Sequence, residues 1–173
     1  MLLLKEELVK LRGCIRSGII PYVKIGKTIK FLMGVDKKHK ELSDFGGGVK
    51  LNETVIRAGK RELFEEVKEL ICEDDISDVK IGIYDRHNST CVLFCEIINC
   101  ELAERLQKEF IKTVKHGDEY NEMSSLVWIS TNDMIQLVYS SESGITGKYN
   151  MWNRIKFTLL NSGEFDDRLL ALL

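Results

Sequence analysis

The sequence is poor in proline, in long apolar runs and in net charge. It has one proline in 173 residues, and it has no run of about 18 apolar residues that would span a bilayer. The opening Met-Leu-Leu-Leu is followed at once by Lys-Glu-Glu, which is too short an apolar run for a signal peptide. A net charge of −2 argues against nonspecific attraction to nucleic acid over the whole surface, although a local basic groove is compatible with it. We expect a cytoplasmic protein with no membrane association.

The sequence also lacks the cysteine patterns of a zinc site or a disulfide framework. Its five cysteines are odd in number and scattered, no CxxC occurs, and the three histidines are isolated. We therefore expect reduced thiols, most of them buried, as in cytosolic or nuclear proteins.

The length and the 44% hydrophobic content fit one domain, 1–173, with its own core. Apolar periodicity and turn residues predict strands interleaved with a few helices, which is an α+β domain. We expect 101–116 to be a helical insertion and 149–173 to form C-terminal helices. The expected elements are a short helix in 1–12, strands in 14–35, a hairpin of 80–84 and 90–97, a helix at 101–114, a strand at 126–130, a helix at 131–139, a Ser/Gly-rich loop at 140–147, and helices at 149–160 and 166–173.

One stretch carries most of the chemical information. A glycine run at 46–48 leads into a predicted helix from Asn52, a candidate N-cap, to about Ile71. Four carboxylates share one face of this helix at i, i+3, i+4 and i+7, namely Glu62, Glu65, Glu66 and Glu69. Like charges at i, i+4 cost roughly 0.2–0.5 kcal/mol per pair. The face is either simply solvated or holds a divalent cation such as Mg²⁺ or Mn²⁺, which prefer oxygen ligands.

The glycine run and the acids together resemble a known motif. Gly47, Glu53 and the run Arg61-Glu62-Leu63-Phe64-Glu65-Glu66 lie at the spacing of the Nudix box of Nudix hydrolases. The similarity spans Gly47–Glu69. The sequence departs from it at Lys68, where the family has glycine, and at Glu69, where the family has an apolar residue.

The resemblance implies a metal site. In the family the paired glutamates and the preceding glutamate gather Mg²⁺ or Mn²⁺ around a pyrophosphate. Carried over, the ligands are Glu62, Glu65 and Glu66, and Arg61 orients them through charge-assisted hydrogen bonds.

The resemblance also implies a substrate-binding loop. Gly47 and Gly48 would let the backbone bend tightly where a side chain would collide. Glu53 would bind a metal-held water or brace the loop, unless it is simply a first-turn glutamate that favours the helix dipole.

A further acid is expected near the second half of the chain. In many Nudix enzymes, a glutamate just before a strand similar to Leu126-Val-Trp128 is an extra metal ligand or the general base. Glu122 best matches that place, and Glu119 is the alternative. Either one is equally well explained as a solvated loop acid.

The resemblance implies an α/β/α sandwich with a mixed central sheet. It implies hydrolysis of a phosphoanhydride in a nucleoside diphosphate linked to another group. Substrates would be small nucleotide derivatives or, because 122–128 is similar to mRNA-decapping Nudix enzymes, capped RNA. A non-catalytic module that binds nucleotide or RNA is the rival interpretation, and loss of the motif acids would have favoured it.

Overall fold

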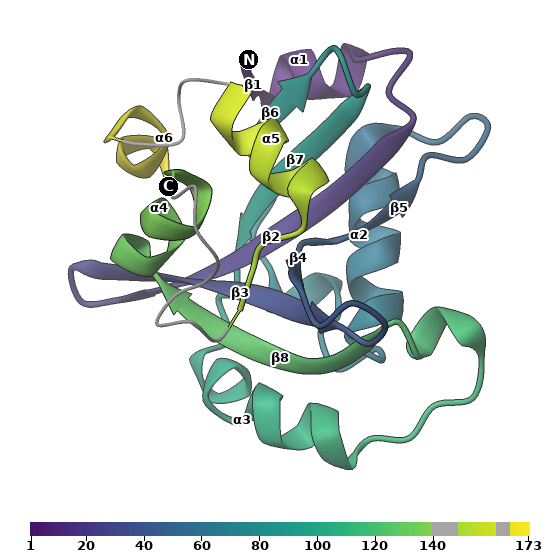
Figure 1. Ribbon diagram of the computed structural model, residues 1–173, viewed down its shortest axis with the longest axis vertical. Coiled ribbons are helices and arrows are strands. Elements are labelled where there is room, and N and C mark those ends of the chain that lie inside the picture. Colours follow the sequence, from purple (N-terminus) through teal and green to yellow (C-terminus); the bar gives the residue numbers. More distant parts are fainter. Residues whose placement is uncertain (140–148, 162–166) are drawn as a thin grey trace.

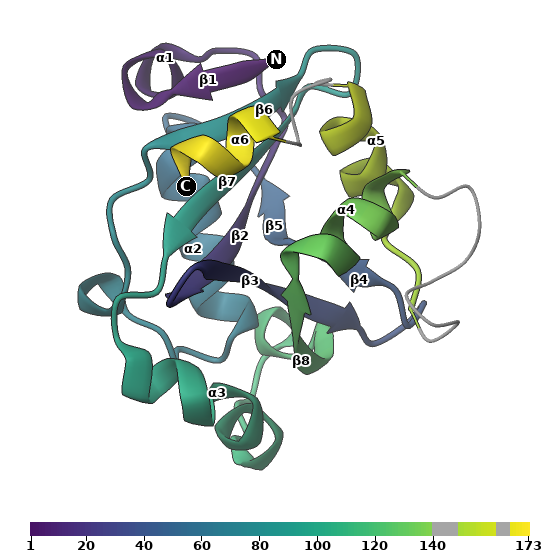
Figure 2. The ribbon, with the colours of Figure 1, turned by 90° about the vertical axis from the view of Figure 1, so that its left-hand side faces the viewer.

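The computed structural model has a mixed sheet at its centre, with helices on both faces (Figure 1, Figure 2). It describes residues 1–139, 149–161 and 167–173, apart from the side chains of Glu119, Asp167 and Arg168. The strand order is β1-β6-β7-β2-β3-β4, and in addition β5 pairs with β2 and β8 pairs with β3. The β2–β7 pair is parallel and the other strand pairs are antiparallel.

The strands are β1 (Leu2–Leu4), β2 (Arg16–Ile25), β3 (Thr28–Asp36), β4 (Leu42–Ser43), β5 (Phe45–Gly48), β6 (Ile81–Asp85), β7 (Thr90–Glu96) and β8 (Met123–Ser130). The helices are α1 (Lys5–Lys10), α2 (Val55–Glu66), α3 (Cys100–Lys112), α4 (Thr131–Tyr139), α5 (Asn153–Asn161) and α6 (Asp167–Leu172), with 3₁₀ turns η1 (Glu73–Asp75) and η2 (Asp118–Tyr120).

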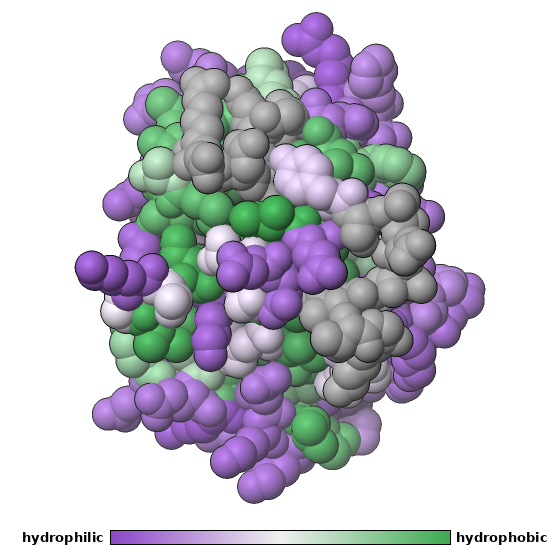
Figure 3. Space-filling view, turned by 60° about the vertical axis from the view of Figure 1, so that its left-hand side comes forward, coloured by the Kyte–Doolittle hydropathy of each residue, from purple (hydrophilic) through white to green (hydrophobic). Residues whose placement is uncertain are grey.

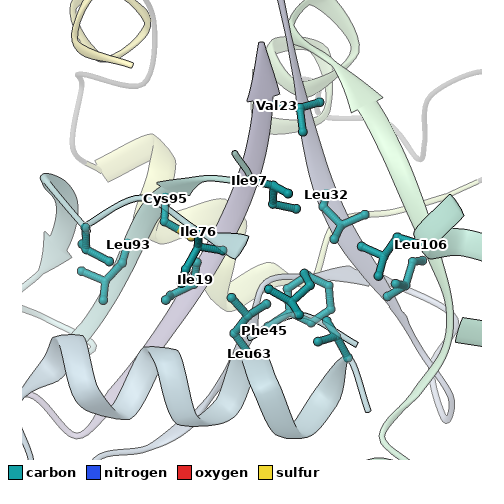
Figure 4. Close-up of a cluster of buried hydrophobic side chains, with 14 of the residues drawn as sticks. Ile19, Val23, Leu32, Phe45, Leu63, Ile76, Leu93, Cys95, Ile97 and Leu106 are labelled. Atoms are coloured by element: carbon teal, nitrogen blue, oxygen red, sulfur yellow. The ribbon is translucent and has the colours of Figure 1, made fainter. Parts of the chain in front are cut away.

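Each face of the sheet has its own apolar cluster. On one face, Leu63 of α2 and Leu106 of α3 pack with Ile19, Leu32 and Phe45 of the sheet (Figure 4). On the other face, residues of α4, α5 and α6 pack against the opposite sides of the same strands. The alternation of side chains along each strand therefore produces the three layers of the predicted sandwich.

The surface mixes hydrophobic and hydrophilic residues. In the view of Figure 3, hydrophobic patches near the middle are interrupted by hydrophilic side chains, and the lower rim is mostly hydrophilic. In the described part of the chain, no helix combines the length and apolar character needed to cross a bilayer.

The structure confirms most of the predicted elements. The hairpin forms from β6 and β7, with Cys91 and Cys95 buried. The expectation that most thiols are buried was wrong, because Cys72 and Cys100 are exposed and Cys14 is only partly buried. The predicted helices at 101–114, 131–139 and 166–173 match α3, α4 and α6 within about two residues. The Ser/Gly-rich loop predicted at 140–147 lies outside the described residues.

Near both chain ends a predicted helix is present but begins later than its predicted range. The short helix predicted within 1–12 forms as α1, and Leu2–Leu4 before it pairs with β6 as a strand. The helix predicted at 149–160 is α5, and it begins at Asn153, not at Tyr149. Instead, Met151 forms a bridge with Leu42, and Trp152 donates its backbone N–H to the Leu42 carbonyl oxygen at 2.8 Å. Long-range pairing of backbone groups therefore overrides helix propensity at both places.

Candidate active site

The glycine run is an extended strand that passes very close to its neighbours. A Cβ on Gly46 would lie 2.4 Å from the Gly18 Cα, and one on Gly47 would lie 2.4 Å from a carboxylate oxygen of Glu62. At Gly48 nothing lies within 4 Å. The prediction of a tight backbone bend at the glycines is thus wrong, because β5 is paired with β2 along its whole length. The expected collision is present at Gly46 and Gly47 and absent at Gly48.

The helix α2 begins later than predicted. Thr54, not Asn52, is the N-cap, and its hydroxyl accepts a hydrogen bond from the Arg57 backbone N–H at 3.3 Å. Asn52 has φ 64° and lies in a turn that Glu53 closes, because the Lys50 N–H donates to the Glu53 carboxylate at 3.0 Å. Glu53 therefore lies before the helix and braces the loop that enters it.

The helix also ends earlier than predicted, at Glu66 and not near Ile71. Lys68 and Glu69 have φ 60° and 58°, in the left-handed region. The Lys68 N–H donates to the Glu65 carbonyl at 2.9 Å, and the Glu69 N–H donates to the Phe64 carbonyl at 2.7 Å. These two bonds form a Schellman motif, whose first left-handed residue is usually glycine. The position where the Nudix box has glycine is that residue here, occupied by Lys68.

Arg61 holds the carboxylates of this helix in place. Its guanidinium donates to both carboxylate oxygens of Glu53 at 3.0 and 3.1 Å, to Glu62 at 2.5 Å and to Glu65 at 3.3 Å. It also donates to the Gly48 carbonyl oxygen at 3.0 Å. The hydrogen bonds from Arg61 lower the pKa of Glu53, and they raise the pKa of Arg61 in turn. Arg61 thus joins the end of β5 to the acidic face of α2.

Glu66 is the most buried acid of the motif, with 2% of its surface exposed. The Gly46 backbone N–H donates to its carboxylate at 2.9 Å. Burial, followed by the charges of Asp44 and Glu122, raises the pKa of Glu66 well above its usual value. A carboxylate in such surroundings favours a proton or a cation as its partner.

Glu122 reaches the same place from another element. It directly precedes β8, and its backbone carbonyl accepts a hydrogen bond from the Lys37 N–H at 2.8 Å. Its negative charge is close enough to Glu66 to help raise the pKa of that carboxyl group. The side chain of Glu119, the alternative candidate, lies outside the described residues.

Two residues at this site were missed by the sequence reasoning. Asp44 is fully buried, and Arg16 pairs with both of its carboxylate oxygens at 2.9 and 2.6 Å. Arg16 also donates to the Gly46 carbonyl oxygen at 3.1 Å, and its guanidinium lies 5.0 Å from the Trp152 ring centroid. The available signal for Asp44 was an acid two residues before the glycine run, between Ser43 and Phe45.

A cavity of about 210 Å³ opens where these groups meet. It is lined by Glu66, Glu122, Arg16, Trp152 and residues of the charged 36–43 loop, among them Asp36 and His39. That loop therefore forms one wall of the cavity. Glu65 does not line this cavity and faces a more open pocket beside Arg61.

The donor set suits a hard divalent cation. Glu62, Glu65, Glu66 and Glu122 supply carboxylate oxygens, and the crowding around Glu66 would be relieved by a bound cation. Among the described residues, no three acids, histidines or cysteines already stand in metal-binding arrangement. The side chains of Glu62 and Glu65 are turned to Arg61 instead.

Glu69 does not belong to this site. Its carboxylate accepts hydrogen bonds from Lys115 at 2.5 Å and from the Tyr120 hydroxyl at 3.1 Å. Lys68 next to it donates to the carbonyl oxygens of Phe110 and Thr113 at 3.0 and 2.8 Å. Both departures from the family pattern therefore contact the segment between α3 and β8.

No family model matches this chain, and no curated protein sequence matches it. Several solved structures are similar to it. The chain is similar to a C. elegans Ap4A hydrolase in a binary complex, with a TM-score of 0.52 and 15% identity over 87% of this chain and 96% of that chain. It is also similar to a MutT/nudix family protein from Listeria innocua, with a TM-score of 0.50 and 13% identity over 93% and 99% of the two chains. These similarities confirm the predicted fold, the α/β/α sandwich of Nudix hydrolases.

Proposed function

We propose that this chain, which has the Nudix hydrolase fold, is a metal-dependent hydrolase of nucleoside diphosphate derivatives. The observation that carries the proposal is the buried Glu66 carboxylate, which is held by the Gly46 N–H and crowded by Asp44 and Glu122. Burying several carboxylates together is costly unless a cation joins them. All the motif acids are present, which argues against a non-catalytic module.

The proposal assigns a role to each residue of the site. Glu62, Glu65, Glu66 and Glu122 would hold Mg²⁺ or Mn²⁺, which when bound neutralises developing negative charge and activates water. Arg61 keeps Glu62 and Glu65 aligned, and a side chain at Gly47 would push the Glu62 carboxylate out of its place. Glu122 would either complete the ligand set or accept the proton of the attacking water.

We infer candidate substrates from the reaction class and from one similar solved structure. The similar C. elegans protein is an Ap4A hydrolase, a dinucleoside polyphosphate enzyme by its name. We therefore place dinucleoside polyphosphates first among candidate substrates, followed by nucleotide sugars, nucleoside triphosphates and capped RNA.

The test is turnover of this panel with and without Mg²⁺ or Mn²⁺. We expect phosphoanhydride cleavage that needs the metal and is lost in Glu66→Gln. Glu6→Gln is the matched control, because it removes an exposed carboxylate on α1 that does not line the cavity. Nucleotide binding without hydrolysis of any panel member would favour the binding module instead.

A further inference from the structure

The loop between β3 and β4 turns one histidine toward the cavity that Glu66 and Glu122 line, which we call the acid cavity. Of the four residues at the tip of this loop, 37–40, His39 lines the cavity and the three lysines do not. The His39 side chain is 60% exposed, so it lies at the mouth of the cavity and not at its floor. In Figure 1 the loop lies beside the start of β8, the strand that follows Glu122.

Backbone hydrogen bonds hold this loop in place. The Lys40 N–H donates to the Asp36 carbonyl oxygen at 3.0 Å and closes the turn. Lys40 has φ 61°, a left-handed conformation that is unfavourable for lysine. The Lys37 N–H donates to the Glu122 carbonyl oxygen at 2.8 Å, which ties the loop to the segment before β8. Main-chain contacts therefore fix the place of His39 relative to the acid that precedes β8.

Asp36 orients the imidazole ring of His39. The ring Nδ1 lies 3.1 Å from the Asp36 Oδ1, and the same oxygen accepts the His39 backbone N–H at 2.5 Å. Because a carboxylate only accepts hydrogen bonds, Nδ1 is the donor and carries a proton. The ring Nε2 is then the nitrogen that is left for a second partner, and in the described part of the chain no hydrogen bond engages it.

The groups around His39 decide what this second partner can be. The charged side chains that line the cavity with it are the acids Asp36, Glu41, Glu66 and Glu122 and the cation Arg16. Arg16 is already paired with both carboxylate oxygens of Asp44. A phosphate group at Nε2 would place His39 between two anions, and two anions favour the doubly protonated ring, which donates from both nitrogens.

We propose that His39, oriented by Asp36, donates a hydrogen bond from Nε2 to a phosphate oxygen of the substrate at the mouth of the acid cavity. The proposal rests on the proposed function, because it assigns His39 to the substrate of that reaction. A hydrogen bond between a cationic donor and a phosphate oxygen is of the strong, charge-assisted kind. His39 is thus a substrate-binding residue that lies outside the motif 47–69.

The first experiment observes the ring nitrogens of His39 by NMR in the ¹⁵N-labelled full chain at neutral pH. The probe is methylenediphosphonate with Mg²⁺, because it has the shape of pyrophosphate and its bridge is not hydrolysed. Calorimetry measures its binding separately, and His39→Gln identifies the signals. The probe should shift Nε2 of His39 to the position of a protonated nitrogen. His87 and His116 are internal controls that should not respond, because both are exposed and neither lines the cavity.

The second experiment compares the kinetics of three variants on a substrate of the panel. His39→Gln should raise KM about tenfold with a smaller change in kcat, because it removes a hydrogen bond to a charged group. Asp36→Asn keeps an acceptor for Nδ1 but removes the charge that favours the doubly protonated ring, so it should raise KM by less. Lys38→Gln is the matched control, because it changes the neighbouring residue of the loop, which does not line the cavity. Melting curves check that all three variants fold.

The outcomes separate this proposal from the proposed function. The role of His39 is overturned if the probe does not bind, if it binds without protonating Nε2, or if His39→Gln and Lys38→Gln have the same KM. Protonation of His39 by the probe in a chain that hydrolyses no substrate would keep the phosphate contact and reject the hydrolase. Metal-dependent hydrolysis with an unresponsive His39 would keep the hydrolase and reject the phosphate contact.

Discussion

The ammonium group of Lys68 lies 2.8 Å from the carbonyl oxygen of Thr113, and this contact fastens the end of α2 to the segment after α3. The Lys115–Glu69 pair makes a second connection a few residues further on. The fastened segment leads directly to Glu122, which contacts Glu66 at the last residue of α2. The distance between these two candidate ligands is therefore set partly by Lys68, which takes the place of the family glycine.

We expect Lys68→Gly to impair the metal site more than the fold. The left-handed backbone conformation of Lys68 costs about 1 kcal/mol or more, and glycine adopts it without strain. This gain in folding free energy offsets part of the loss of the Lys68 hydrogen bonds. The thermal midpoint should therefore change little, whereas the Mg²⁺ concentration for half-maximal turnover should rise several-fold. Lys68→Arg, which keeps a donor, should recover most of the activity. Lys112→Ala, a loss of an exposed lysine at the end of α3, serves as the control. An unchanged Mg²⁺ requirement in Lys68→Gly would contradict this role.

Gly47→Ala should lower turnover strongly, because its Cβ would lie 2.4 Å from a Glu62 carboxylate oxygen. The Glu62 side chain would have to move away from its place next to Arg61. Gly48→Ala is a matched control one residue away, where nothing lies within 4 Å of the added Cβ. Steady-state assays and melting curves of the two variants make the comparison. Equal activities would show that close passage of β5 does not matter for the site.

Glu66→Gln should abolish most turnover and at the same time stabilise the metal-free protein by about 1 kcal/mol, because it removes a buried charge next to Asp44 and Glu122. The amide oxygen can still accept the Gly46 N–H, so packing is kept. Denaturant unfolding in EDTA and initial rates at limiting Mg²⁺ check the two parts. Wild-type rates in this variant would show that Glu66 is not a principal ligand.

Metal should raise the thermal stability of the wild type. A cation that binds only the folded acid cluster contributes RT ln(1 + [L]/Kd), or about 2.7 kcal/mol at a hundredfold excess over Kd. Melting curves with Mg²⁺ or Mn²⁺ and with EDTA measure the shift, and Glu66→Gln should lose most of it. If millimolar metal shifts no midpoint, with or without nucleotide, the acids are not a metal site.

The local part of the site could be predicted from the sequence, but the long-range part could not. Spacing placed Glu62 and Glu66 on one face of a helix, because a helical period fixes neighbours at i+4. The Arg16–Asp44 pair joins residues 28 apart, and it forms only because β2 pairs with β5. Nothing in local propensity indicates that pairing. The end of α2 could not be predicted either, because lysine rarely adopts the left-handed conformation that Lys68 has.

Glu122 offers a test that separates three roles. If it is the general base, Glu122→Gln should lower kcat by about 10²–10⁴-fold with little change in substrate binding, because an amide does not accept the proton of water. If it is a metal ligand, raising Mn²⁺ should recover part of the loss. If it only braces the start of β8, stability should fall while the folded fraction keeps its specific activity. Its contact with the buried Glu66 favours one of the first two roles over the third.

The matched variant is Glu119→Gln, made and assayed in parallel. Glu122 lines the acid cavity together with Glu66 and helps raise the pKa of Glu66, so its variant should be the damaging one. Rates, KM and Mn²⁺ titrations of both proteins decide between them. An active Glu122→Gln beside an inactive Glu119→Gln would assign the role to Glu119, and the Glu66–Glu122 contact would then be structural.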